Sequence, residues 1–200
     1  TPTPDHAQFH WNTFFKLAFI GLALWGGVMG MLCWQFGWQG ALTQMGWFFT
    51  KAALLTFGGA YAVLPYVYQG AVEHHHWLSA TQMIDDLALG ETTPGPLIMV
   101  VTFVGFLAGW NTLPLGADTL LMSAVIAAIV VTYFTFLPSF VFILAGGPLV
   151  ESTHGNLKFT APLLAITAAV VGVILNLAVF FALHVFWPNG FPGEFDGVAA

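Results

Sequence analysis

Two breaks built from glycine and proline interrupt an otherwise apolar part of this 200-residue chain. The first is the pair Gly58 and Gly59, and the second is the run 92–96, which reads Thr-Thr-Pro-Gly-Pro. Glycine pairs and Pro-Gly-Pro sequences are typical of turns. In a lipid-buried chain, irregular backbone is tolerated only where protein covers it or where it lines a cavity. The two breaks therefore indicate a membrane protein that contains a polar site.

The scarcity of charge leads to the same class of protein. Hydrophobic residues make up 58% of the chain and charged residues 6%, whereas a soluble domain carries roughly 25% charged residues. We expect an all-α polytopic membrane protein with about five transmembrane helices, some of them broken or re-entrant. The expected division is a linker at 1–13, a transmembrane transporter half-domain at 14–187 and a polar tail at 188–200.

Charge and motif content exclude several function classes. The chain has a formal net charge of −6, with three lysines and no arginine, which excludes nucleic acid as a partner. It has no nucleophile elbow, phosphate-binding loop or zinc-ligand helix, so we expect neither an enzyme nor a cofactor. The histidines at 74–76 lack the i, i+4 spacing that places two imidazoles on one helical face, so we expect no metal site there.

Three apolar segments are long enough to cross a membrane: 14–34, 119–145 and 162–187. In the first, Gly26 and Gly30 have the small-xxx-small spacing that predicts a helix-packing face. In the second, Pro138 predicts a kink, and residues 146–160 are expected to form the loop that follows. An odd number of crossings places the two ends on opposite sides of the membrane, as one half of an inverted repeat requires.

The remaining apolar segments are broken or short. A connection is expected at 35–46, and residues 47–72 are long enough to cross, but the glycine pair divides them into two half-helices. Ser79 and Gln82 form a capping-box pattern that starts a short helix at 80–90, which is expected to lie in the interface or to re-enter. Residues 96–110 are too short to cross alone.

The second break has the signature of a helix N-terminus. A hydroxyl cap at Thr92 or Thr93 and the prolines Pro94 and Pro96, with Gly95 between them, precede an apolar helix. Buried at the middle of a membrane, such a terminus directs free amides and about half a positive charge at an anion. A purely structural kink is the alternative. For Gly58 and Gly59 the alternatives are close approach of a ligand and close helix packing.

Paired discontinuous helices are how secondary transporters form a site at the membrane midplane, so we predict that both breaks line a substrate site. Lys51 is the only cation close in sequence to either break, and it either snorkels to the interface or faces the cavity. Glu91 and Asn176 are assigned to coupling or gating. The other acidic residues around the short helix at 80–90 can also exchange protons or gate the passage of an anion: Glu73, Asp85 and Asp86. Most of the acidic residues in this region are expected to be hydrated charges at the interface.

The broken segments closely resemble the chromate ion transporter family. The resemblance rests on residues 57–65, 77–78, 87–96 and 103–106 and extends to 165–176. It implies an inner-membrane carrier that exports chromate, a tetrahedral dianion, and confers chromate resistance. The form of the motif at 91–96 is similar to that of the C-terminal half of a long member with two homologous halves. The partners implied are chromate, the lipid bilayer, and the homologous other half or a second copy.

The residues and the resemblance together predict a secondary transporter half that works by alternating access. Sulfate has the shape and charge of chromate and is expected as a competing or exchanged ion. Two alternatives remain open: a scaffolding subunit in which the breaks only kink helices for packing, and an anion channel.

Overall fold

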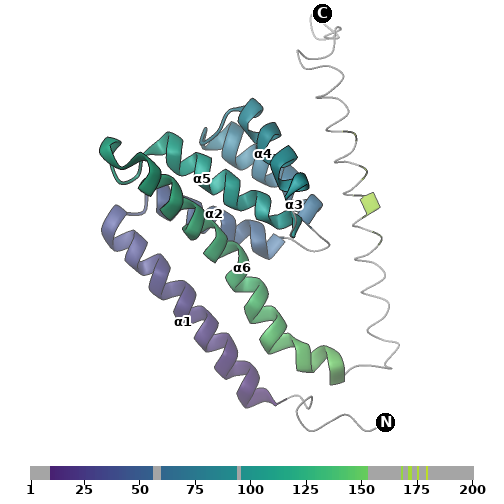
Figure 1. The fold of residues 1–200 in the computed structure, drawn as a ribbon. Helices are drawn as coiled ribbons and strands as arrows, with labels where there is room; N and C mark the ends of the chain where they lie inside the picture. The colour runs from purple at the N-terminus through teal and green to yellow at the C-terminus, as the bar shows by residue number, and fades with distance from the viewer. Residues whose placement is uncertain are drawn as a thin grey trace, which may run out of the picture.

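The computed structural model describes residues 10–55, 60–93 and 96–152 and the single residues 168, 171, 172, 175 and 179. Within these residues every regular element is helical (Figure 1). The α-helices are α1 (Trp11–Phe36), α2 (Ala41–Leu55), α3 (Ala60–Tyr68), α4 (Ala80–Thr92), α5 (Val100–Thr112) and α6 (Leu120–Ser152). A π-helix, η2 (Gln69–His74), continues α3, and two 3-10 turns, η3 (Leu97–Met99) and η4 (Ala117–Thr119), precede α5 and α6. The all-helical membrane class is confirmed.

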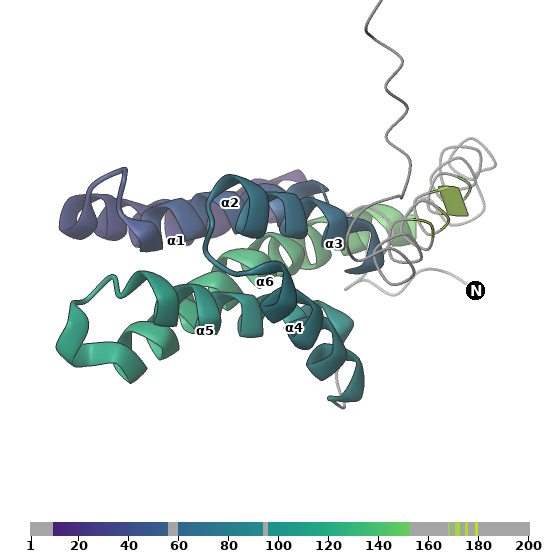
Figure 2. The ribbon, with the colours of Figure 1, turned by 90° about the horizontal axis from the view of Figure 1, so that it is seen from above.

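Helix α6 is the centre of the described bundle, and it packs against α5, α2 and α1. Seen from above, α1, α2 and α3 form one row, and α4 and α5 lie in another (Figure 2). Among the described residues, two helices are long and apolar enough to cross a membrane: α1, with 26 residues, and the segment Leu120–Gly147 of α6, with 28. The last predicted span, 162–187, lies outside the described residues apart from five single positions, so the count of five crossings stays a prediction.

Two predicted boundaries differ from the structure. Helix α2 begins at Ala41, inside the expected connection at 35–46, because Leu42 and Met45 are already fully buried in the core. Helix α6 runs through Pro138 and continues to Ser152, inside the expected loop at 146–160. In an apolar environment backbone N–H and C=O groups find hydrogen-bond partners most readily within the helix itself. The pair Gly146 and Gly147 therefore does not end α6.

The glycine face predicted on α1 is not used within the described chain. A Cβ atom placed on Gly26, Gly27 or Gly30 would meet nothing within 4 Å. The close glycine packing lies instead on α5, where Gly105 and Gly109 face α6. A Cβ on Gly105 would lie 2.8 Å from the Cβ of Val131. The spacing is the same in both helices, and only the face that is turned toward α6 distinguishes them.

Helices α4 and α5 form an antiparallel hairpin. The Asn111 side chain near the end of α5 donates to the carbonyl of Trp77 at 2.8 Å and to the side chain of Gln82 at 3.3 Å, beside the start of α4. At the other end, Gly90 of α4 packs against Val100, the first residue of α5. Each helix has 13 residues, or about 20 Å, which is shorter than the roughly 30 Å hydrocarbon layer.

The capping box predicted at the start of α4 is confirmed. The Ser79 hydroxyl accepts from the Gln82 backbone N–H at 3.2 Å, and the Gln82 side chain accepts from the Ser79 N–H at 2.9 Å. The helix then runs to Thr92, two residues beyond the expected end at Gly90.

Removing this cap gives a first testable prediction. Ser79→Ala leaves the Gln82 N–H without its acceptor, so the protein is expected to lose about 1 kcal/mol of stability. Ser139→Ala, a change on an exposed position inside α6, is the matched control and is expected to change stability little. Denaturation in detergent measures both, and equal losses would show that the box does not stabilise α4.

Candidate functional site

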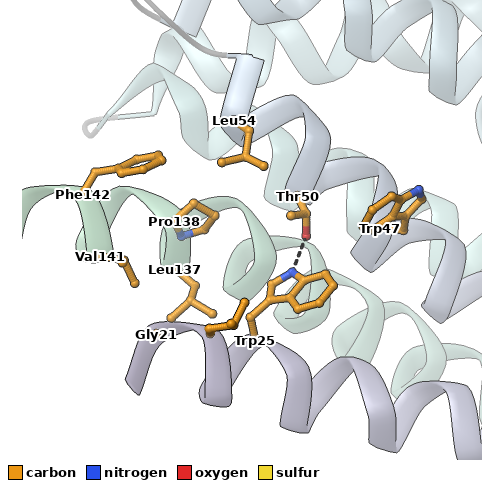
Figure 3. A pocket seen from close by; sticks show the side chains of 10 residues that line it. Gly21, Trp25, Trp47, Thr50, Leu54, Leu137, Pro138, Val141 and Phe142 are labelled. Atoms are coloured by element: carbon orange, nitrogen blue, oxygen red, sulfur yellow. Dashed lines mark hydrogen bonds between the residues drawn. The ribbon is translucent and has the colours of Figure 1, made fainter. Parts of the chain in front are cut away.

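One cavity between α1, α2 and α6 is apolar and does not suit an anion. It has a volume of about 320 Å³, and apolar side chains such as Leu54 and Val141 form its wall. Figure 3 shows that the Trp25 indole points at Thr50. The indole N–H donates to the Thr50 hydroxyl at 3.0 Å, and that hydroxyl donates to the Gly46 carbonyl at 2.7 Å. These polar groups therefore form hydrogen bonds with one another and not with a ligand in the cavity.

A second cavity has a different chemistry. It has a volume of about 400 Å³ and lies where α2, α3 and η2 meet; we call it the Lys51 pocket. The lining contains one lysine, two histidines and two glutamines and no carboxylate: Trp38, Gln44, Trp47, Phe48, Lys51, Tyr66, Gln69, Gly70, His74 and His75. Such a set of donors without acidic groups favours an anionic ligand.

Stacked aromatic rings hold the wall of the Lys51 pocket in place. Phe48 of α2 stacks on Tyr66 of α3, with ring centroids 4.9 Å apart and planes 6° from parallel. His75 stacks in the same way on Trp77 at 4.3 Å and 7°. The Phe48 ring lies against Gly70, where a Cβ atom would overlap it. The π-helical turn thus brings its backbone close to α2 and places His74 and His75 at the rim.

The electrostatics of the pocket are set by Lys51. Its Nζ lies 5.9 Å from the centroid of the Trp47 ring, and among the described residues no carboxylate pairs with it. Burial, followed by the nearby His74 and Lys51, lowers the pKa of His75 below its usual value. At neutral pH the His75 imidazole is therefore uncharged, and it has one ring nitrogen to donate and one to accept. The fixed positive charge of the pocket comes from Lys51.

Two of the predicted site residues form hydrogen bonds at the end of the preceding helix, α4. The Thr93 hydroxyl donates to the Leu89 carbonyl at 2.7 Å, and the Thr92 hydroxyl donates to the carbonyls of Ala88 and Leu89 at 3.0 and 3.1 Å. Both hydroxyls therefore close the C-terminus of α4. The expectation that one of them also caps the next helix involves Gly95, which lies outside the described residues, and stays a prediction.

The other predicted site residues are described only in part. Pro96 is exposed and directly precedes η3, and Glu91 lies in the last turn of α4. Five predicted positions lie outside the described residues: Gly58, Gly59, Pro94, Gly95 and Asn176. The elements that follow the two breaks, α3 and η3, pack against each other.

Sequence reasoning identified Lys51 but not the residues around it. His74 and His75 were considered as metal ligands and rejected as such, and no role was given to Gln44, Gln69 or Tyr66. The sequence held one usable indication of these pocket residues. Residues 74–76 are the only run of consecutive histidines, and they directly follow the broken segment at 47–72.

Comparison with known proteins decides the family. Residues 43–196 match the family described as chromate transporter. The chain belongs to the chromate transporter family. A chromate transport protein of Cupriavidus metallidurans is 31% identical over 157 residues, which are 78% of this chain and 34% of that protein. A chromate transport protein of Pseudomonas aeruginosa is 40% identical over 124 residues, which are 62% of this chain and 26% of that protein. No solved structure matches the chain.

The match divides the described bundle. It begins at residue 43, so α1 precedes it, whereas all of the Lys51 pocket except Trp38 lies within it. The chain spans about a third of the length of the Cupriavidus relative. An uncharacterized transporter of Methanocaldococcus jannaschii is similar over 31% of its own length. Family membership and the apolar helices together support a membrane protein.

Proposed function

We propose that this chain is one half of a secondary transporter that exports chromate across the inner membrane by alternating access. The observation that carries the proposal is the Lys51 pocket, which lies in the family-matched region and is lined by donors without a carboxylate. Chromate is a tetrahedral dianion, and the chromate transport proteins to which this chain is similar support it as the substrate.

The substrate is proposed to bind where the two breaks meet. The contact of α3 with η3 supports this arrangement, because these elements follow the glycine pair and the Pro-Gly-Pro run directly. In this proposal the backbone at Gly58, Gly59 and 92–96 supplies amide donors, and Lys51 supplies the positive charge. The α4–α5 hairpin is proposed as the re-entrant element, with the second break at its tip. Glu91 and Asn176 remain proposed for coupling or gating.

The membrane potential favours outward movement of such an ion. At about 2.3 kcal/mol per charge per 100 mV, a dianion gains roughly 4.6 kcal/mol on leaving a cell that is negative inside. Sulfate is proposed as a competing or exchanged ion because it has the same shape and charge. The proposed partner is the homologous other half or a second copy, which together with this chain would form the inverted repeat.

Ligand-dependent stabilisation tests the proposed function. In the whole protein, chromate or sulfate at 100 times its dissociation constant is expected to add about 2.7 kcal/mol to the stability, because it binds only the folded state. Nitrate, a planar monoanion, is the control and is expected to add less at the same concentration. A scaffolding subunit would be stabilised by none of the three, and that result would contradict the proposal.

A further inference from the structure

Asp86 is a buried carboxyl group in the middle of α4. Only 4% of its surface is exposed, and it lies on the same face as the buried Met83 and Gly90 at i, i+3 and i+7 spacing. Its neighbour Asp85 is exposed. The expectation that most acidic residues here are hydrated interface charges therefore does not extend to Asp86, because the register of α4 places it on the buried face with Gly90, which packs against α5.

The environment of Asp86 offers no compensation for a negative charge. Its Oδ2 atom is buried and has no hydrogen-bond partner in the described structure. Helix α4 packs against α5 and η3, and neither element contains a titratable side chain. The facing residues of α5 are apolar and buried, Val100 and Val104 among them. On α4 itself the other ionisable groups are acidic, namely Asp85 and Glu91, and the Glu91 side chain is not among the parts described.

An unpaired carboxylate in such a place is costly, so the group stays protonated to a higher pH than usual. Burial, and secondarily the charge of Asp85, raise the pKa of Asp86 from 3.8 to about 7. Helix α4 is too short to span the membrane, and its first turn is joined to the polar turn at Ser79. The carboxyl group of Asp86 therefore titrates closer to neutral pH than an ordinary aspartate, and it lies two turns from the polar start of its helix.

The position of Asp86 relative to the second break connects its charge to the proposed site. Thr93, at the start of the break, lies seven residues further along, or about 10 Å at the rise of an α-helix. A dianion near the tip of the hairpin is repelled by ionised Asp86 and not by neutral Asp86. That repulsion is weakly screened inside the protein. Ionisation also requires water around the carboxylate, which opposes the packing of α4 on α5.

We propose that Asp86 is a proton site linked to oxyanion binding at the second break. Binding of the anion shifts the carboxylate toward its protonated form, with the proton taken from water, and release of the anion returns the proton; no bond other than O–H forms or breaks. By reciprocity, proton binding raises anion affinity by the same factor as anion binding raises proton affinity. The inference rests on the proposed function, because it concerns the same anion.

Proton uptake on sulfate binding tests the linkage. Sulfate is the probe because it remains a dianion around neutral pH, whereas chromate itself takes up a proton there. The whole protein, purified in weakly buffered detergent with a pH-indicator dye, is expected to take up a fraction of a proton on binding sulfate near pH 7. Its sulfate affinity is expected to fall by about tenfold as the pH rises through the pKa of Asp86.

The variants separate Asp86 from other titrating groups. Asp86→Asn is expected to bind sulfate with the low-pH affinity at every pH and to lose the uptake, whereas Asp85→Asn keeps both responses. Asp86→Glu is expected to restore the pH dependence. Proton uptake that persists in Asp86→Asn would come from another group, and it would overturn this inference without affecting the proposed function. If the wild-type protein bound neither sulfate nor chromate, the proposed function would fail, and this linkage with it.

An infrared titration provides a readout that a merely structural role would not change. The band of a protonated carboxylic acid is expected to titrate near neutral pH in the wild-type protein and in Asp85→Asn. In Asp86→Asn the part of this band that titrates near neutral pH is expected to be absent. A wild-type spectrum in which no carboxyl group titrates near neutral pH would overturn the assignment of Asp86 as the proton site.

Discussion

Gly109→Val is expected to prevent α5 from packing on α6. A Cβ atom on Gly109 would lie 2.5 Å from the Ser123 carbonyl oxygen, 2.5 Å from the Ala127 Cβ and 2.9 Å from the Ala124 Cα. These are atoms of the α6 backbone and the Cβ next to it, which no rotamer change can move. Overpacking against side chains costs about 1–3 kcal/mol, and we expect a loss above about 3 kcal/mol here because the helices must separate.

The matched control for this prediction is Gly26→Val on α1. Gly26 is helical like Gly109, but it is exposed, and a Cβ atom there would meet nothing within 4 Å. Both substitutions place the same side chain in a helix, so intrinsic helix propensity cancels in the comparison. Denaturation in detergent measures the two losses. If Gly26→Val lost as much stability as Gly109→Val, the α5–α6 contact would not explain the effect.

This pair of glycines also shows what the sequence could not provide. Gly26 and Gly30 on α1 have the same spacing as Gly105 and Gly109 on α5, and the pattern says only that a close approach is possible. Both helices pack against α6, and the tertiary arrangement decides which glycine face is turned toward it: that of Gly105 and Gly109, not that of Gly26 and Gly30. Local signals were more dependable: the capping box at Ser79 depends on four consecutive residues and formed as predicted.

The candidate site was predictable to a similar extent. The scarcity of positive charge identified Lys51, because a single lysine near two breaks is evident in the sequence. The stacking of Phe48 on Tyr66 and the edge contacts of Phe48 with His75 and Trp77 were not predictable, because they join α2 to segments 18 or more residues away. The burial of Asp86 likewise depends on the helical register of α4 relative to α5. Residues 85 and 86 are both aspartate, and the sequence does not say which of them faces inward.

Lys51→Gln is expected to weaken oxyanion binding by about 10- to 150-fold. Glutamine retains a hydrogen-bond donor and much of the length of lysine but has no charge, and a hydrogen bond to a charged group contributes about 1.5–3 kcal/mol. No carboxylate lines the Lys51 pocket, so the lost charge is not offset by the release of a paired acid. The dissociation constants of chromate and sulfate, measured from ligand-dependent stabilisation, provide the test.

Two further variants decide whether charge in this particular pocket is the cause. Lys51→Arg keeps the charge and is expected to retain most of the affinity. Lys16→Gln removes an equal charge from α1, where Lys16 is exposed and lies outside the family-matched region, and it is expected to leave binding unchanged. The alternative role of Lys51 is to cover the Trp47 ring, which its Nζ approaches to 5.9 Å. In that case Lys51→Gln would change stability slightly and anion affinity no more than Lys16→Gln does, and the Lys51 pocket would no longer be a candidate for the anion site.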